Sequence, residues 1–340
     1  MTGVYITIDT EYASALPGVG GPGTRAENFA RSIACETPSG PVGIGHQMDV
    51  MERHGLKGVF FVDPMPALVW GVAAIEDVVG SIVARGHDVQ LHCHSEWLAL
   101  APGNPLTRRT GQHLRQFPLE DQRRILGWAR DTLVAAGAPH PVAFRAGNYG
   151  ANDDTLRALA EIGIEYDTSH CPALAGHGDC AITLGHEHRA AMWHRGVIEV
   201  PVGCVEDFGG RLRHAQITAL SFDELTGALR RARDTGQDGF TVVSHSFELA
   251  SRDRTRRNRV VARRFERFCA SLAAMPGCHS ATYTNDPPRP AAERAVPVLA
   301  FNPIRSGARV VEQAVANALY ATRLPEKVKQ TASMGMLMLC

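Results

Sequence analysis

Two hydrophobic patterns alternate along this chain. Short apolar runs rich in β-branched and aromatic residues recur from end to end and are typical of buried strands. They predict strands at 4–8, 58–62, 88–92, 142–145, 164–166, 197–202, 240–244 and 281–284. Between these runs, apolar residues spaced three to four positions apart predict amphipathic helices at 42–54, 73–85, 119–136, 153–162, 222–235 and 258–274.

This order of elements predicts an α/β fold. Strands that alternate with helices of about 10–15 residues indicate βαβ units and a parallel sheet. Seven or eight such units within about 285 residues favour a barrel, and an open doubly wound sheet remains the alternative. The proline-rich segment at 286–290 interrupts the pattern, and a helix is expected at 310–321. We therefore expect a barrel over residues 1–286 and a C-terminal extension over 287–340 that docks on it.

Composition narrows the classes of function. The apolar fraction of 44% and the charged fraction of 21% are ordinary for a globular protein, so disorder is excluded as the main state. The 35 Lys and Arg residues balance 35 Asp and Glu residues, so no overall charge favours nucleic acid or an anionic membrane. We expect no membrane span, and the start of the chain lacks the features of a signal peptide, which predicts a cytoplasmic protein. The oligomeric state is not predicted.

Residues with useful chemistry follow most of the predicted strands. Asp9 and Glu11 follow the first strand, His92 and His94 end the third, and Arg145 ends the fourth. Asp63, Asp167 and His245 stand at the ends of three others. The ends of parallel barrel strands share one rim, where the active sites of such folds lie. A single strand-end Asp or His is usually a cap or a hydrogen-bonding residue, but several on one rim indicate a functional site.

Two pairs in this set have metal-binding spacing. His92 and His94 are two residues apart, as are Asp9 and Glu11, and residues i and i+2 of an extended segment point to the same side. Two imidazoles and one carboxylate, with positions left open for water, are the ligand set of a catalytic zinc-type site. The sequence therefore predicts a divalent metal site.

Seven segments, in order along the chain, resemble the polysaccharide deacetylases of the NodB-homology type, carbohydrate esterase family 4. They are Thr-Ile-Asp-Thr-Glu (7–11), Lys-Gly-Val-Phe-Phe-Val (57–62), Gly-His-Asp-Val-Gln-Leu-His-Cys-His (86–94), Arg-Ala-Gly-Asn-Tyr-Gly (145–150), Tyr-Asp-Thr-Ser (166–169), Ile-Glu-Val-Pro-Val (198–202) and Val-Val-Ser-His (242–245). The resemblance covers roughly residues 4 to 286. It implies a distorted (β/α)7 barrel, a divalent metal and hydrolysis of an N-acetyl group on a sugar.

The resemblance also implies roles for individual residues. Asp9 matches the catalytic base, Arg145 the arginine that orients it, and His245 the histidine that protonates the leaving amine. His92 and His94 match the metal histidines. Zinc is the expected ion, with cobalt, nickel and manganese as alternatives, and a carbohydrate is the expected partner. We further expect Tyr149 and Asp167 to contact the substrate.

This chain departs from the family pattern at three motifs. The usual Thr-Phe-Asp-Asp-Gly reads Thr-Ile-Asp-Thr-Glu, which places Thr10 where the metal aspartate normally stands, so we assign the carboxylate ligand to Glu11. The usual HxxxH is shortened to HxH, and Glu96 stands four residues after His92. The proline of the arginine motif is missing.

Three interpretations of function follow. The first is a metal-dependent carbohydrate N-deacetylase. The second keeps the site but takes a small-molecule amide or cyclic ureide, and the third is a barrel that binds glycans without turnover. Two further features stay open: a His- and Cys-rich stretch at 170–194, which is more typical of a loop than of a second metal site, and eight arginines within 252–267, which form either a solvated helix face or an anion-binding patch.

Overall fold

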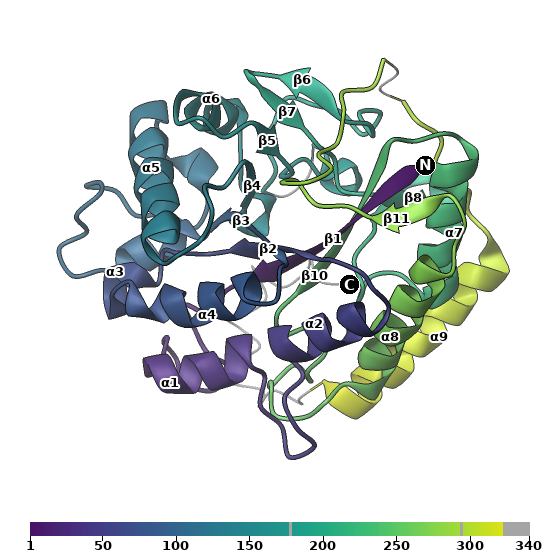
Figure 1. Cartoon of the computed structure of the whole chain (residues 1–340), viewed down its shortest axis with the longest axis horizontal. Coiled ribbons are helices and arrows are strands. Elements are labelled where there is room, and N and C mark those ends of the chain that lie inside the picture. The colour runs from purple at the N-terminus through teal and green to yellow at the C-terminus, as the bar shows by residue number, and fades with distance from the viewer. Residues whose placement is uncertain (177–178, 293–294, 322–340) are drawn as a thin grey trace.

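The computed structural model describes residues 1–176, 179–292 and 295–321, and seven parallel strands form its centre (Figure 1). The neighbouring strands, in spatial order, are β10 (Gly239–His245), β1 (Thr2–Thr10), β2 (Val59–Val62), β3 (Asp88–Cys93), β4 (Ala143–Ala146), β5 (Tyr166–Asp167) and β7 (Val197–Glu199). The sheet curls, and isolated parallel bridges join Val202 to Thr241 and Gln216 to Val243 of β10. This is the predicted distorted barrel of (β/α)7 type.

Four short strands complete the sheet structure. β6 (Met192–His194) pairs antiparallel with β7, and β11 (Cys278–Ser280) pairs with the beginning of β1. β8 (Cys204–Glu206) and β9 (Leu212–His214) form a separate two-stranded sheet. The barrel wall is therefore continuous from β10 to β7, and the single bridges from Val202 and Gln216 to β10 complete it.

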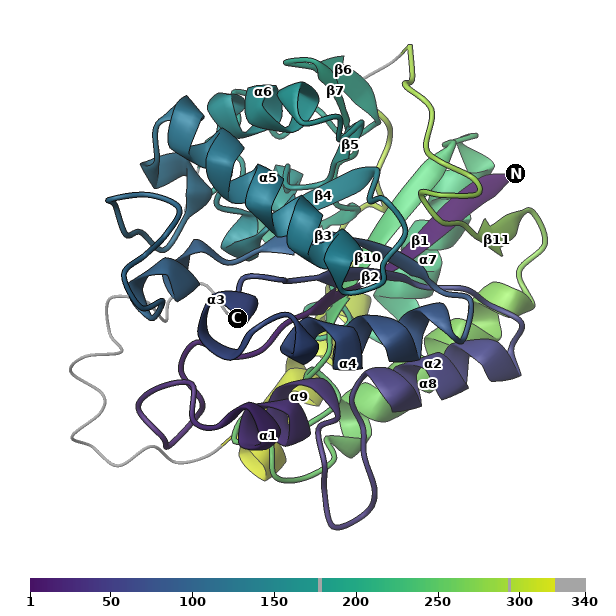
Figure 2. The same cartoon turned by 60° about the vertical axis from the view of Figure 1, so that its left-hand side comes forward.

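Helices surround the outside of the sheet (Figures 1 and 2). The six predicted helices are all present to within two residues at each end: α2 (Ile44–Arg53), α4 (Ala73–Val83), α5 (Leu119–Ala135), α6 (Asp153–Glu161), α7 (Phe222–Asp234) and α8 (Arg259–Ala273). The side chain of Asn258 accepts a hydrogen bond at the start of α8, and Ser221 and Glu224 form a capping box on α7. The short helices are α1 (Arg25–Asn28) and α3 (Ala67–Trp70).

Every residue of β1 is buried, because both faces of this strand are covered. Ile6 and Ile8 pack outward against the helix layer. Tyr5 belongs to a second apolar cluster with Phe61 and Tyr166, which fills the inside of the barrel. Because side chains alternate along a strand, Thr7 and Asp9 share the inner face with Tyr5.

The predicted strand at 281–284 is wrong. β11 ends at Ser280, and the residues after it turn into the mouth of the barrel. The carboxylate of Asp88 accepts hydrogen bonds from the backbone N–H of Tyr283 (2.9 Å) and the hydroxyl of Thr284 (2.7 Å). The Tyr283 ring then packs against Tyr5 and Tyr166, with centroids 5.2 and 5.6 Å apart. This segment closes one end of the barrel and extends no strand.

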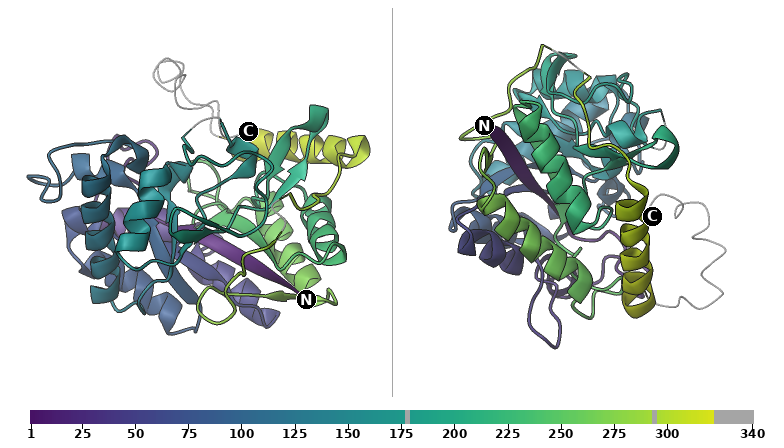
Figure 3. Two further views of the ribbon diagram at one scale, coloured as in Figure 1. Left: turned by 90° about the horizontal axis from the view of Figure 1, so that it is seen from above. Right: turned by 90° about the vertical axis from the view of Figure 1, so that its right-hand side faces the viewer.

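The last described helix, α9 (Pro303–Tyr320), starts seven residues earlier than predicted and packs on α7 and α8 (Figure 3). Arg309 is buried and fastens it, since Nε donates to Glu224 (3.1 Å) and Nη2 to Asp207 (2.9 Å). Gln313 donates to the carbonyls of Thr218 and Ala219. A domain boundary at residue 286 stays a prediction. Within the described ranges, none of the helices combines the length and apolarity that crossing a bilayer requires.

Replacing Arg309 by Met should lower the free energy of unfolding by about 3 kcal/mol, because Glu224 and Asp207 lose the cation that compensates their burial. Urea denaturation followed by circular dichroism measures this. Arg263→Met on the exposed face of α8 is the matched control and should change stability by less than about 0.5 kcal/mol. Equal midpoints for the two variants would contradict the fastening role of Arg309.

Candidate metal centre and catalytic site

The candidate residues converge on the inner face of the barrel at the carboxyl ends of its strands. Asp9 lies near the end of β1 and Glu11 just after it. His92 belongs to β3 and His94 follows it, while Arg145 and His245 come from β4 and β10. On β3 the alternation is plain: Val89, Leu91 and Cys93 pack in the outer core, so His92 and His94 face inward.

Glu11, His92 and His94 form a compact group of possible metal ligands. One carboxylate oxygen of Glu11 lies 3.2 Å from Nε2 of His92 and 2.5 Å from Nε2 of His94. One donor atom from each residue lies within 4.8 Å of the others, and it is the only such group of three among the described residues. The structure thus brings together the three side chains that the spacing of the motifs predicts as possible metal ligands.

The outer nitrogens of both imidazoles are already engaged. Nδ1 of His92 lies 2.7 Å from the carbonyl oxygen of Arg145, and Nδ1 of His94 lies 3.1 Å from the carboxylate of Glu96. A hydrogen bond donated by each Nδ1 would leave the lone pair of Nε2 available to an ion shared with Glu11, which is how metal-ligating histidines are usually oriented. Glu96 also accepts a hydrogen bond from the hydroxyl of Ser14 (3.3 Å), so it supports the imidazole of His94 from the Nδ1 side and is not one of the possible metal ligands.

The side chains of Glu11, His92 and His94 strongly influence one another's charge. Burial raises the pKa of Glu11, but His94 and His92 outweigh it and the net shift is well downward. Burial lowers the pKa of His94, but Glu11 and Glu96 raise it well above the ordinary value. An ionised carboxylate facing two imidazole nitrogens in a buried position suits a divalent ion of the zinc type. The donor set therefore fits the expected cofactor.

Asp63, at the end of β2, lies behind the histidines. It is buried, and one of its oxygens accepts from the backbone N–H of Met65 (3.0 Å). Its other oxygen has no hydrogen-bond partner among the described residues. Burial, above all, raises the pKa of Asp63 to about 7. It is a neighbour of the metal group and not a member of it.

Asp9 and Arg145 form an ion pair inside the barrel. Nη1 of Arg145 donates to Asp9 (2.6 Å) and to the hydroxyl of Thr7 (2.9 Å), and the guanidinium carbon lies 4.6 Å from the centre of the Phe61 ring. Arg145 is fully buried; burial acts to lower its pKa, but Asp9 and other neighbours raise it overall. Asp9 thus has a permanent positive partner and a fixed orientation.

His245 faces the second oxygen of Asp9, with Nε2 at 3.8 Å. Its Nδ1 lies 2.9 Å from the carboxylate of Glu248, which also accepts from Gln216, from Thr218 (3.2 Å) and from Ser244 (3.3 Å). Burial lowers the pKa of His245, but Glu248 and then Asp9 raise it to about 9. Glu248 was not foreseen; an acid three residues after a strand-end histidine was its only sign in the sequence.

The two residues expected to bind substrate are placed differently. Tyr149 has a left-handed backbone (φ +55), as does Asn148 (φ +53), and its hydroxyl has no partner among the described residues. Such strain is typical of functional loops. Asp167 is fully buried, and its oxygens accept from the hydroxyl (2.7 Å) and backbone N–H (3.0 Å) of Ser169. Asp167 therefore stabilises the segment that contains Ser169 from the interior of the barrel.

The unusual motif positions and the histidine-rich stretch have structural partners. The hydroxyl of Thr10 donates to the carbonyl of Ile8 (3.0 Å) and is buried away from the metal group. In the stretch 170–194, Nε2 of His170 lies 3.2 Å from the carbonyl of His188, and His194 lies 3.4 Å from Asp153. His177 lies outside the described residues.

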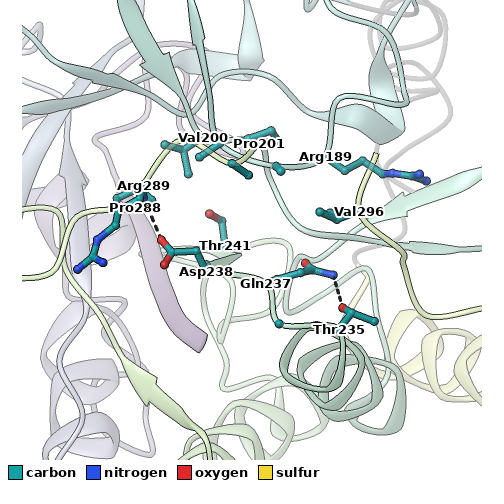
Figure 4. A pocket seen from close by; sticks show the side chains of 15 residues that line it. Arg189, Val200, Pro201, Thr235, Gln237, Asp238, Thr241, Pro288, Arg289 and Val296 are labelled. Atoms are coloured by element: carbon teal, nitrogen blue, oxygen red, sulfur yellow. Dashed lines mark hydrogen bonds between the residues drawn. The ribbon is translucent and has the colours of Figure 1, made fainter. Parts of the chain in front are cut away.

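A cavity of about 230 Å³ opens elsewhere, at the amino end of β10 (Figure 4). The turn that precedes this strand forms one wall, and Val200 and Pro201 lie opposite it. Asp238 in this wall accepts from the backbone N–H of Arg289 (2.9 Å). The catalytic candidates lie at the other end of the strands, so this cavity is separate from them.

Comparisons with known proteins point in one direction. Residues 42–166 match the polysaccharide deacetylase family model, a range that includes His92, His94, Arg145 and Tyr149. A peptidoglycan deacetylase-like protein, FGM2 of Gibberella zeae, is 25% identical over 178 residues, which are 51% of this chain and 44% of that protein. The chain therefore spans less than half the length of this curated relative.

A crystal structure from Mycobacterium smegmatis, described as a candidate polysaccharide deacetylase, shares the fold. It superposes with a TM-score of 0.53 at 19% identity, covering 83% of this chain and 87% of that one. Together these comparisons confirm the family resemblance that the motifs indicate, and they confirm the barrel.

Gly147 controls how closely the chain approaches His94. A Cβ atom added there would lie 2.7 Å from Nδ1 and 2.8 Å from Cδ2 of that imidazole. Gly147→Ala should therefore displace the ring and weaken binding of Co²⁺ by roughly tenfold or more, as loss of a supporting contact does at other metal sites. Absorption titration with Co²⁺ measures the affinity. Gly80→Ala, where an added Cβ meets nothing within 4 Å, should bind like the unchanged protein; equal affinities for both variants would refute the constraint.

Proposed function

Taking the match to the polysaccharide deacetylase family as the premise, we propose that this chain is a metal-dependent hydrolase that removes an N-acetyl group from an acetamido sugar. The sugar belongs to a polysaccharide, an oligosaccharide or a glycan precursor. The observation that carries the proposal is the meeting of two sets at one rim: the Glu11, His92 and His94 group, and the Asp9–Arg145 pair facing His245. The cytoplasmic location stays a prediction.

Glu11, His92 and His94 would hold the metal, which we propose to be zinc on the basis of its nitrogen and carboxylate donors. When bound, the ion supplies a Lewis acid that polarises the acetyl carbonyl and lowers the pKa of water. The hydrogen bonds from Nδ1 of both histidines keep their rings in the orientation that this requires. Tyr149 follows β4, and its hydroxyl has no hydrogen-bond partner among the described residues.

Asp9 is the general base. It takes the proton of the attacking water as the new C–O bond forms, and the hydrogen bond from Arg145 to one oxygen keeps the carboxylate in place. Because Nη1 of Arg145 also donates to Thr7, the guanidinium cannot follow Asp9 if the carboxylate rotates. The base therefore starts each cycle in one orientation.

His245 is the general acid. Its pKa of about 9 means that it carries a proton at neutral pH, and Glu248 holds that charge. It delivers a proton to the amide nitrogen as the C–N bond breaks, which releases acetate and a free amine. Asp9 and His245 thus carry protons in opposite directions in one turnover.

The two carboxylates can be separated by experiment. Zinc-loaded protein should release acetate from an N-acetylated sugar panel. Asp9→Asn should keep the metal and lose about 10²–10⁴-fold in kcat, the range of general-base catalysis. Glu11→Gln should lose metal. Metal analysis and an acetate assay measure both effects.

A reversed outcome, with metal lost in Asp9→Asn and kept in Glu11→Gln, would exchange the two roles. Release of ammonia or an amine from small amides or cyclic ureides, without acetate from any sugar, would favour the small-molecule amidohydrolase. Binding of glycans by metal-loaded protein without release of any product would favour the binding barrel.

Glu248 sets the alkaline limit of activity. The folded-state pKa of His245 is raised, so its acid form is present below about pH 9 and is lost above it. Glu248→Gln removes the negative charge that raises this pKa most, so the alkaline limb of kcat/KM should move to lower pH and kcat should fall roughly tenfold. A pH–rate profile measures the shift, with the exposed Glu76→Gln as control. If kcat falls while the alkaline limb stays in place, Glu248 has a packing role only.

A further inference from the structure

The arginine-rich segment at 252–267 does not form one surface. Four of its eight arginine side chains have partners on the outside of the barrel. Arg257 pairs with Glu266 (2.8 Å) and Arg264 with Glu312 (3.0 Å), and Arg267 lies over the Phe222 ring (3.9 Å). Arg256 donates to the carbonyl of Leu319 at the end of α9. The patch considered from the sequence is thus largely used for packing.

Arg254 is placed differently. Its guanidinium carbon lies 3.9 Å from the centre of the Phe247 ring, and that ring lies 5.3 Å from the imidazole of His245. Two aromatic contacts therefore connect this cation to the catalytic acid. Nη1 donates to the hydroxyl of Ser32, which is its only hydrogen bond to a described residue, and no described carboxylate forms an ion pair with it.

The backbone holds Arg254 in this position under strain. Its φ is +58, a left-handed conformation that side chains rarely adopt. The backbone N–H donates to the carbonyl of Ser251 (2.7 Å), and an antiparallel bridge between Ala250 and Arg257 closes the loop. Strain of this kind persists where the surrounding structure fixes it, and it is concentrated at ligand-binding sites.

The local charges also favour an anion. Burial lowers the pKa of Arg254, whereas Cys35 and Glu11 act to raise it and Arg31 acts to lower it. The interaction with Glu11 places the guanidinium in the field of the metal group. Arg31 adds a second cation, whose Nη2 donates to the carbonyls of Pro17 and Asp253. A half-buried guanidinium with one hydrogen bond to a described residue has N–H groups left to bind a pair of ligand oxygens.

We propose that Arg254 is a specificity residue that binds an anionic group, carboxylate or phosphate, carried by the acetamido-sugar substrate. This inference rests on the proposed function and names the substrate class of the same site. Phe247 contacts both the Arg254 guanidinium and the His245 imidazole, so we infer that the anionic group binds on the side of the site where His245 lies. A planar guanidinium stacked on a ring can donate hydrogen bonds to two oxygens side by side, a geometry that a lysine ammonium does not offer.

The test compares three forms of N-acetylglucosamine: the neutral sugar, one with an ether-linked carboxylate and one with a phosphate monoester. Acetate release gives kcat/KM for each with zinc-loaded protein. The anionic forms should be preferred, and Arg254→Met should reduce the ratio of anionic to neutral kcat/KM by roughly 10–100-fold, the loss of one charge-assisted contact. Arg254→Lys should recover only part of it. Arg263→Met should leave the ratio unchanged. The two anionic arms tell carboxylate from phosphate.

A binding measurement separates this inference from the proposed function. The same sugars are titrated by calorimetry into zinc-loaded Asp9→Asn protein, with and without Arg254→Met. Preferential binding of an anionic sugar that Arg254→Met abolishes would support the inference even if no acetate were released, whereas the absence of acetate would refute only the proposed function. Equal affinity for neutral and anionic sugars, or a preference that survives Arg254→Met, would overturn the inference.

Discussion

Arg145 carries a positive charge that has no access to solvent, so the groups around it must compensate that charge. Its side chain donates hydrogen bonds to Asp9 and Thr7, and its backbone carbonyl oxygen accepts one from Nδ1 of His92. One residue therefore positions the proposed base through its guanidinium and a proposed metal ligand through its backbone. β4 lies next to β3 in the sheet, with Arg145 opposite His92, so the strand register determines the distance between the two halves of the site.

The alternation of side chains on the strands decides which residues can take part. Inner-face positions of β1 and β3 include Asp9 and His92, while the outer-face positions between them hold Ile8 and Leu91 in the helix-packed core. This two-residue period is legible in the sequence, which is why His92 and His94, like Asp9 and Glu11, could be placed on a common face from their spacing alone. The amphipathic period of the helices is equally legible, and the six predicted helices agree with the structure to within two residues.

The errors and omissions have a common physical cause. The segment at 281–284 has the composition of a strand, but the carboxylate of Asp88, almost two hundred residues earlier, takes its backbone N–H groups. Arg254 is an ordinary polar residue until the fold brings its guanidinium to the hydroxyl of Ser32, more than two hundred residues earlier. The local hydrophobic pattern predicts which face of a helix or strand a residue occupies. It does not predict which side chain from a distant part of the sequence will contact that residue.

The separate partners of the two carboxylates explain how one rim can perform two tasks. Glu11 is bound to imidazole nitrogens, which a divalent ion can also use, whereas Asp9 is bound to a guanidinium, which remains charged at any pH of interest. A carboxylate held by Arg145 is a poor choice for a ligand, because the ion would have to share its oxygens with a permanent cation. The same carboxylate suits a base, since Arg145 holds one of its oxygens and the other faces His245 at 3.8 Å. With Thr10 at the position of the family's usual metal aspartate, the roles proposed for Asp9 and Glu11 still fall at the same strand end, one residue further apart.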